Sequence, residues 1–235
     1  MVSTFVLIHS PLVGPMTWQL TAAILRDHGH RVVVPSFADT IDKGPPYYEQ
    51  LAAEVASAIH KSGPMGPAIF VAHSGAGGLI PAAIAASRVS VSAAFFVDAI
   101  LPHPGSSWLD TAPSPLRERI VGLARDDVLP PWNKWFPQEA LVSLLPDENL
   151  RNSFIAELPI LPVRYFQEAA PVLPSSPAAR CGYLQLSSAY EQEAEEAARL
   201  GWPVRRQLAD HLAMLTRPHE VAEGLRQLVG TMNLR

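Results

Sequence analysis

Cysteine is almost absent from the sequence, because Cys181 is the only one among 235 residues. A single cysteine excludes an intramolecular disulfide framework and a cysteine-rich metal site, and we expect its thiol to be a small core side chain beside a strand. An excess of positive charge is also missing, since 18 lysines and arginines against 22 aspartates and glutamates give a net charge of -4. We therefore expect no nucleic-acid partner and no binding to a membrane surface.

Long hydrophobic runs are missing as well. The first apolar run, residues 2–8, has no charged leader and is too short for a signal peptide or a membrane span. We therefore expect a cytoplasmic protein. Apolar residues still make up 48% of the chain and charged residues 17%, which suits one sizeable domain with a full hydrophobic core.

Strand and helix patterns alternate in both end portions of the chain. Six short apolar runs are typical of strands in a parallel sheet, namely residues 4–8, 30–35, 68–72, 89–97, 182–186 and 202–208. Helical spacing lies between and after these runs. It is found at residues 17–28, where Thr17 is the expected cap, at 47–61, in a small-residue stretch after the third run that ends at residue 87, and at 191–200 and 217–229. The alternation predicts an α/β fold with a doubly wound, mainly parallel six-stranded sheet, built from residues 1–100 and 180–235.

The alternation stops between residues 101 and 179. This segment is crowded with proline and carries three of the five tryptophans. Short stretches of helical spacing, each cut off by proline, predict a mostly helical insertion. We expect it to form a cap over the site, with Trp132 and Trp135 as candidates to line an apolar pocket.

Residues 68–80 combine an apolar run, one serine and a glycine-rich helical start. We interpret them as a strand that turns sharply into a helix and presents Ser74 at the corner. Such a turn holds its nucleophile in a strained backbone conformation, so it requires small neighbours, and residues 72 and 75–77 are alanine or glycine.

An acid and a histidine follow two other predicted strands. Asp98 stands after the fourth and His211 after the sixth, and the carboxyl ends of parallel strands share the edge of the sheet where sites are built. A serine hydroxyl becomes an effective nucleophile when an imidazole removes its proton, and the imidazole needs a carboxylate to fix its tautomer. The three residue types and their positions therefore predict a Ser74, His211 and Asp98 triad.

At these residues the sequence resembles the α/β-hydrolase superfamily, in the compact branch that includes plant methyl esterases and hydroxynitrile lyases. Residues 5–9 with Trp18 are similar to the oxyanion loop and its following helix, residues 71–78 to the nucleophile elbow, and residues 210–215 with Pro218 to the histidine loop. The order serine, acid, histidine is also the superfamily's order. The resemblance implies that the histidines at positions 9 and 73 are structural, and that the superfamily's first two strands are absent here.

The position of the acid departs from the superfamily's usual pattern. The acid usually follows the strand that corresponds to residues 182–186, but residues 187–191 contain no aspartate. Some members carry the acid after the preceding strand, where Asp98 stands. We favour Asp98 over Glu191, which remains the alternative acid, because geometry defines a triad more than sequence position does.

The oxyanion loop departs from the pattern at Pro11. This position usually donates a main-chain hydrogen bond to the oxyanion, and proline has no amide hydrogen. The oxyanion hole would then use the amides of Gly75 and Leu12, or the hydroxyl of Ser10, which is also a pocket candidate.

We therefore expect a hydrolase of carboxylic esters, or of thioesters or lactones, with a largely apolar small-molecule substrate and no cofactor or metal. Ser74 would attack the carbonyl carbon, and His211 would act as base and then as acid. Two other hypotheses stay open. One is a lyase or cyclase that uses Ser74 and His211 for proton transfer, and the other is a non-catalytic binding module. A homodimer also remains possible.

Overall fold

In the computed structural model, six strands form one parallel sheet in the order β2-β1-β3-β4-β7-β8. The structure describes residues 3–38, 40–63, 65–173, 180–207 and 209–234. The strands are β1 (Thr4–Ile8), β2 (Arg31–Val33), β3 (Ala68–Ser74), β4 (Val91–Ala99), β7 (Arg180–Gln185) and β8 (Val204–Arg206). The strand order reverses direction beside β1, so the predicted doubly wound parallel sheet is confirmed.

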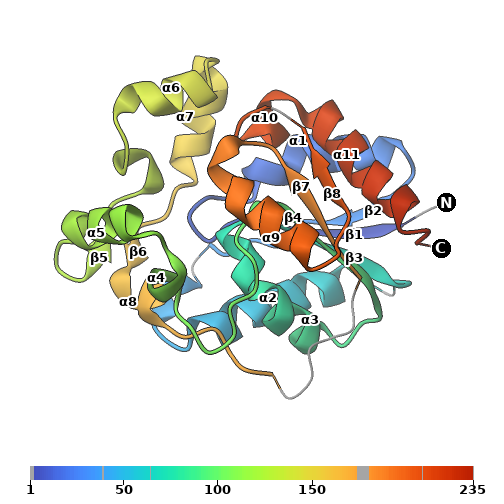
Figure 1. Ribbon diagram of the computed structural model, residues 1–235, viewed down its shortest axis with the longest axis horizontal. Helices are drawn as coiled ribbons and strands as arrows, with labels where there is room; N and C mark the ends of the chain where they lie inside the picture. The colour runs from blue at the N-terminus through green and yellow to red at the C-terminus, as the bar shows by residue number, and fades with distance from the viewer. Residues whose placement is uncertain (1–2, 39, 64, 174–179, 208, 235) are drawn as a thin grey trace.

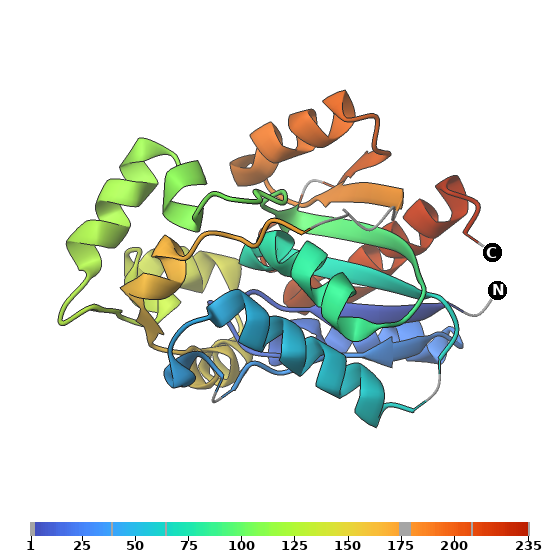
Figure 2. The ribbon, with the colours of Figure 1, turned by 90° about the horizontal axis from the view of Figure 1, so that it is seen from below.

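Helices cover both faces of this sheet. Successive residues of a strand point to opposite faces, so each strand contributes side chains to two hydrophobic cores. Phe5 and Leu7 pack into the core beneath α1 (Met16–Asp27) and α11 (Pro218–Thr231), whereas Val6 and Ile8 pack into the core beneath α2 (Tyr47–Lys61) and α3 (Ile80–Ser87). All four strand side chains are fully buried. Figures 1 and 2 show the two helical layers, with the short α10 (Ala213–Thr216) beside α1 and with α9 (Glu191–Arg199) near β7.

Several predicted boundaries differ from the structure. Thr17 does not cap α1, which begins at Met16 after Pro15, and its hydroxyl instead donates to the carbonyl oxygen of Gly14. The chain after Ser74 first forms a 3₁₀ helix, η2 (Gly75–Leu79), and only then α3. Leu208, the predicted end of the last strand, and residues 174–179, the predicted end of the insertion, lie outside the described residues.

The chain between β4 and β7 folds apart from the sheet, and we call it the insertion. Figure 1 shows its helices gathered at the end of the molecule opposite the two termini. Its elements are short, as the prolines indicate: α4 (Trp108–Thr111), α5 (Ser114–Leu123), η3 (Trp132–Lys134), α6 (Gln138–Leu144), α7 (Glu148–Ala156) and α8 (Val163–Gln167). The strands β5 (Val128–Leu129) and β6 (Leu161–Pro162), which the sequence did not indicate, pair antiparallel within it.

Two glutamates of the insertion bind the first residues of core helices. The Glu157 carboxylate accepts the amide of Met16, the first residue of α1, at 2.8 Å. Glu168 accepts the amides of Tyr47 and Tyr48, at the start of α2, at 2.8 and 2.9 Å. A carboxylate at a helix N-terminus satisfies free amides and interacts favourably with the helix dipole. These contacts hold the insertion to helices on both faces of the sheet.

The remaining short 3₁₀ helices are η1 (Ile41–Lys43), before α2, and η4 (Ser188–Tyr190), between β7 and α9. Within the described part of the chain, no helix is both long enough and apolar enough to cross a membrane.

Candidate active site

Ser74 stands at a strained corner between β3 and η2. Its φ of 55° and ψ of −125° are unfavourable for a residue that has a β-carbon, and such strain is concentrated at functional sites. The corner also packs directly against the chain that leaves β4, since a β-carbon on Gly77 would lie 1.7 Å from the carbonyl oxygen of Ile100. Glycine is therefore required at position 77 for this close approach.

Asp98 leaves the regular ladder at the end of β4. His73 pairs with Val97 and Ser74 pairs with Ala99, so Asp98 has no partner on β3, and its φ is 42°. The Tyr183 hydroxyl fixes the chain beside this bulge, because it accepts the amide of Ala99 at 3.0 Å and donates to the carbonyl oxygen of Ala99 at 2.8 Å. The bulge directs the fully buried Asp98 carboxylate toward the loop after β7.

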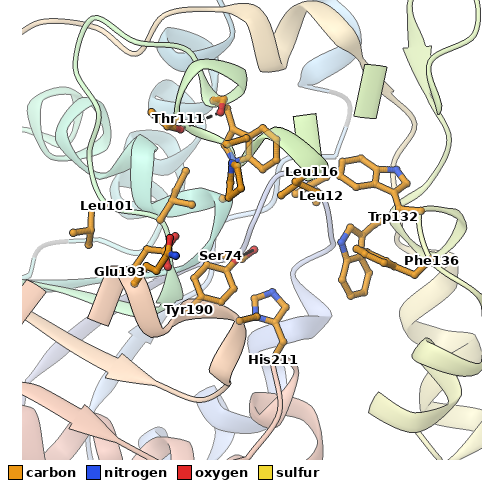
Figure 3. Close-up of a pocket in the computed structure, with 18 of the residues that line it drawn as sticks. Leu12, Ser74, Leu101, Thr111, Leu116, Trp132, Phe136, Tyr190, Glu193 and His211 are labelled. Atoms are coloured by element: carbon orange, nitrogen blue, oxygen red, sulfur yellow. Dashed lines mark hydrogen bonds between the residues drawn. The ribbon is translucent and has the colours of Figure 1, made fainter. Parts of the chain in front are cut away.

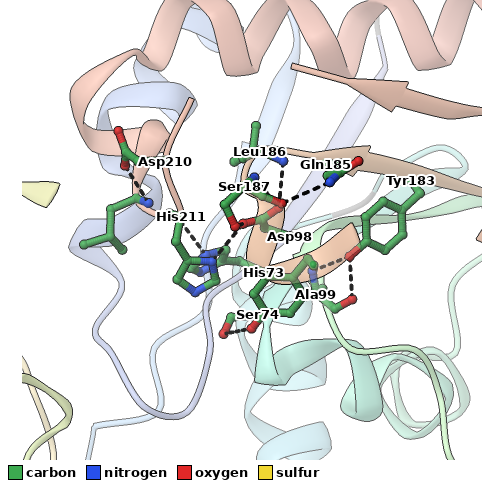
Figure 4. Close-up of polar contacts among 12 residues, drawn as sticks. His73, Ser74, Asp98, Ala99, Tyr183, Gln185, Leu186, Ser187, Asp210 and His211 are labelled. Carbon is green, nitrogen blue, oxygen red and sulfur yellow. Dashed lines mark hydrogen bonds and ion pairs between the residues drawn. The ribbon is translucent and has the colours of Figure 1, made fainter. Parts of the chain in front are cut away.

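The Asp98 carboxylate joins two loops (Figure 4). Its Oδ1 accepts the main-chain amides of Leu186 at 2.6 Å and Ser187 at 2.9 Å, and its Oδ2 accepts the Ser187 hydroxyl. The same Oδ2 lies 3.0 Å from Nδ1 of His211. Nδ1 therefore carries the ring hydrogen and donates a hydrogen bond to the Asp98 carboxylate. Nε2 of His211 is then free of hydrogen and can accept a proton.

Two further histidines hold the loops around the site. His73 donates from Nε2 to the main-chain oxygen of His211 at 3.1 Å, and its ring lies 4.6 Å from that of His211. His9 donates from Nδ1 to the carbonyl oxygen of Ser10 at 2.8 Å. Burial lowers the pKa of His73 well below its usual value and lowers the pKa of His9 to about 4. Both rings are therefore neutral near pH 7, and both make the positioning contacts that the resemblance implied.

Glu191, the alternative acid, lies away from His211. Its carboxylate accepts the Gln185 amide at 2.7 Å and pairs with Arg206 at 3.3 Å, and nearly half of its side chain is exposed. These hydrogen bonds, that to Gln185 above all, lower the pKa of Glu191. The structure therefore brings Asp98, and not Glu191, to Nδ1 of His211.

Tyr190 is a residue of the site that the sequence analysis missed. Its hydroxyl lies 3.1 Å from Oγ of Ser74, and its ring stacks on that of His211 with centroids 5.0 Å apart and planes 7° from parallel (Figure 3). Within the described residues, no hydrogen bond joins Oγ of Ser74 to His211. Burial raises the pKa of Tyr190, so its hydroxyl stays protonated and can donate. The sequence feature that could have identified Tyr190 is its place in residues 187–191, the segment in which the superfamily usually carries its acid.

The oxyanion loop presents fewer donors than the sequence analysis allowed. The Leu12 amide donates to Oγ of Ser10 at 3.3 Å, so it already has an acceptor. Ser10 is itself buried and is not among the residues that line the main cavity, so its assignment as a pocket residue stays a prediction. Gly75 is the first residue of η2, where an amide has no acceptor within its own helix, and it lines the cavity beside Ser74.

A cavity of about 710 Å³ opens above Ser74 and His211, between the insertion and α9 (Figure 3). The insertion lines one side with apolar groups, including the expected Trp132 and Trp135. Trp132 lies 6.3 Å from the His211 ring, and the Trp135 indole donates to the carbonyl oxygen of Pro130 at 2.8 Å. The other side carries polar side chains of α9: Gln192, Glu193, Glu196 and Arg199. The site therefore offers a large, mainly apolar space with a polar wall beside the serine.

Among the described residues, no group of three histidine, cysteine, aspartate or glutamate side chains is placed to hold a metal ion.

Solved structures share this fold over nearly the whole chain. An extracellular alpha/beta-hydrolase from a Paenibacillus species, described as sharing structural and functional homology with tobacco salicylic acid binding protein 2, gives a TM-score of 0.78 at 21% identity, covering 96% of this chain and 98% of that one. Tomato methylketone synthase I complexed with 2-tridecanone gives 0.71 at 15% identity and covers 99% of both chains. A pyrethroid hydrolase from Sphingobium faniae gives 0.71 at 16% identity and covers 98% of both. At these identities the likeness shows the fold alone.

Sequence comparison identifies the family independently of these structures. No curated protein sequence matches the chain significantly. The sequence profile of the alpha/beta hydrolase family, however, matches residues 5–224, which is most of the chain. The match spans the elbow at Ser74, Asp98 and the histidine loop. The resemblance drawn from the sequence is thereby confirmed, and the chain belongs to the alpha/beta hydrolase family.

Proposed function

We propose that the protein hydrolyses carboxylic esters, or related thioesters or lactones, through an acyl-enzyme on Ser74. The observation that carries this proposal is the 3.0 Å contact between Asp98 and Nδ1 of His211, at the edge of the sheet where Ser74 stands in its strained turn. Family membership supports hydrolase chemistry, and two of the similar structures are described as hydrolases.

The first half of the reaction transfers the acyl group to the enzyme. Ser74 gives its proton to Nε2 of His211 while Oγ bonds to the carbonyl carbon, and the Asp98 carboxylate stabilises the imidazolium that forms. His211 then returns the proton to the alkoxide leaving group. In the second half, His211 takes a proton from water while the water oxygen bonds to the acyl carbon. His211 then gives this proton to Oγ of Ser74 as the bond between Oγ and the acyl carbon breaks, which releases the acid and the free Ser74 hydroxyl.

The cavity supports an apolar acyl or alcohol group in the substrate. Its insertion side is built of tryptophan, phenylalanine, leucine and proline side chains, which favour removal of hydrocarbon surface from water. A volume of about 710 Å³ lies within the range of small-molecule pockets. In this proposal the insertion is a cap that shapes the pocket and limits the access of bulk water to it.

The test is turnover of p-nitrophenyl esters of graded chain length by the wild type and by Ser74→Ala. We expect wild-type turnover that rises with chain length up to the limit of the cavity, and no turnover by the variant above the uncatalysed rate. A fluorophosphonate should label the wild type and not the variant, and an acyl adduct should be detected on Ser74 by mass spectrometry. Undiminished turnover by Ser74→Ala would refute the proposal.

A second candidate is a lyase or cyclase on the same fold that uses Ser74 and His211 for proton transfer. The observation that favours it is that Oγ of Ser74 is hydrogen-bonded to the Tyr190 hydroxyl, whereas Pro11 lacks an amide that usually stabilises the oxyanion of the tetrahedral intermediate in acyl transfer. Detection of an acyl adduct on Ser74 during turnover would reject this candidate. Turnover of a substrate without any trapped adduct, together with loss of activity in Ser74→Ala, would favour it.

A further inference from the structure

The oxyanion hole lacks a donor at the position of Pro11. A β-carbon placed on Gly75 would lie 4.0 Å from Cδ of Pro11, so this ring carbon faces the elbow where an ordinary residue would present its amide hydrogen. The next amide, that of Leu12, donates to Oγ of Ser10 instead. Oγ of Ser10 would lie nearer, 3.1 Å from the same β-carbon, but Ser10 is buried and does not line the cavity. The oxyanion therefore needs a second donor, beside the Gly75 amide, that faces the cavity.

We propose that the Tyr190 hydroxyl is this second donor and binds the oxyanion of the tetrahedral intermediate in place of the amide that Pro11 lacks. This inference rests on the proposed ester hydrolysis at Ser74.

The position of the hydroxyl supports this role. It lies 3.1 Å from Oγ of Ser74, and in the intermediate the oxyanion is only two bonds from that same Oγ. A donor that reaches the nucleophile can therefore reach the oxyanion with a small rotation. Tyr190 also lines the cavity together with Gly75, so both donors face the space that a substrate carbonyl would enter.

The hydroxyl is also held in place before the substrate arrives. The Tyr190 ring stacks on that of His211, and the chain before it is fixed because Ser187 binds Asp98 through its amide and its hydroxyl. Burial raises the pKa of Tyr190, so it presents a neutral O–H and undergoes no net proton transfer. A donor fixed in a buried site stabilises developing charge strongly, because little reorganisation is needed when the charge appears.

In this mechanism the hydrogen bond between Tyr190 and Ser74 breaks when the substrate binds. When an ester carbonyl binds, the Tyr190 hydroxyl exchanges Oγ of Ser74 for the carbonyl oxygen, and Ser74 turns its hydrogen to Nε2 of His211. The serine proton goes to His211 and then to the leaving group, while the Tyr190 proton stays on its own oxygen throughout.

The test compares Tyr190→Phe, Pro11→Ala and the double variant on the ester that the wild type turns over best. Tyr190→Phe keeps the ring on His211 and removes only the donor, so we expect kcat to fall about 10²-fold, the usual effect of one lost oxyanion donor. Pro11→Ala restores an amide at the vacant position. We therefore expect the double variant to recover at least tenfold in kcat over Tyr190→Phe. A trifluoromethyl ketone inhibitor, whose adduct mimics the oxyanion, should bind Tyr190→Phe more weakly by a similar factor.

Two outcomes overturn the inference and leave the proposed function intact. In the first, Tyr190→Phe turns over esters at the wild-type rate while Ser74→Ala is inactive. In the second, Tyr190→Phe has a reduced kcat, and adding Pro11→Ala restores none of it although the double variant is folded by circular dichroism. Tyr190 would then be a positioning residue for Ser74.

Tyr165→Phe, which removes a buried hydroxyl that does not line the cavity, is the matched control and should keep wild-type kcat. Absence of Ser74-dependent ester turnover in the wild type would instead refute the proposed function.

Discussion

Replacing Asp98 by asparagine tests the hydrogen bonds around the buried carboxylate. Asparagine keeps one oxygen, which can still accept the amides of Leu186 and Ser187, but it places an NH₂ group where Oδ2 stood. The Ser187 hydroxyl can rotate and accept from that group. His211 has no such freedom, because its Nδ1 must lose its hydrogen to face a donor, and the ring then carries its proton on Nε2.

The size of the effect follows from that change of tautomer. With a proton already on Nε2, His211 cannot take the proton of Ser74, so we expect kcat to fall by about 10³ to 10⁴. This corresponds to about 4 to 5 kcal/mol of lost transition-state stabilisation. The free energy of unfolding should change little, because the two main-chain amides keep their acceptor. Asp98→Ala would leave both amides without one and should cost about 1–3 kcal/mol for each.

The assay is kcat for a p-nitrophenyl ester alongside urea unfolding of the same variants. The matched control is Glu191→Gln, which changes an acid that contacts Gln185 and Arg206 and lies away from His211. It should retain wild-type kcat. The reasoning is refuted if Asp98→Asn keeps more than a tenth of the wild-type rate, or if Glu191→Gln loses as much activity as Asp98→Asn.

Three further predictions concern stability, each measured as the free energy of unfolding in urea. Gly77→Ala should lower this free energy by about 3 kcal/mol or more, because the added β-carbon would overlap the carbonyl oxygen of Ile100. The control is Gly122→Ala in α5, where nothing lies within 4 Å of the added carbon, and it should raise the free energy by up to about 1 kcal/mol. Equal effects of the two substitutions would contradict the close packing at Gly77. Glu168→Ala should cost about 1–2 kcal/mol by removing the acceptor for two amides of α2, and an unchanged value would show that the contact contributes nothing. Below pH 6.5 His9 becomes protonated in the unfolded chain, whereas in the native state it stays neutral until about pH 4. The free energy of unfolding should therefore fall as pH falls, with His9 contributing about 3 kcal/mol of that fall and His73 adding to it; a smaller slope in His9→Gln checks the assignment.

The sheet and the elbow could be predicted from the sequence because their signals are local. Buried parallel strands require continuous apolar runs, and the predicted range 4–8 coincides with β1. The small residues after Ser74 identified the sharp turn. The predicted strand ended at residue 97, whereas β4 continues to Ala99, but Asp98 still lies at the carboxyl end of its strand, beside the histidine loop. The cytoplasmic location, the possible homodimer and the role of residues 101–179 as a cap stay predictions.

The features that sequence analysis missed depend on residues far apart in the chain. Glu168 binds the start of α2 from about 120 positions away, and no local pattern distinguishes it from a solvated glutamate. Tyr190 reaches Ser74 only because β7 lies beside β4 in the sheet. The Leu12 amide was assigned to the oxyanion hole because the sequence could not show that Oγ of Ser10 turns back to accept it.

The arrangement around Asp98 has a consequence for how such a site can evolve. β4 supplies the charge, while the loop after β7, where the superfamily usually carries its acid, supplies amides and a hydroxyl to receive it. The two segments therefore meet at one point, and a carboxylate could reach His211 from either. An inactive Asp98 variant placed under selection has a short route back, through aspartate at position 187. Revertants at that position would show that the acid can move from one strand to the other without any rebuilding of the fold.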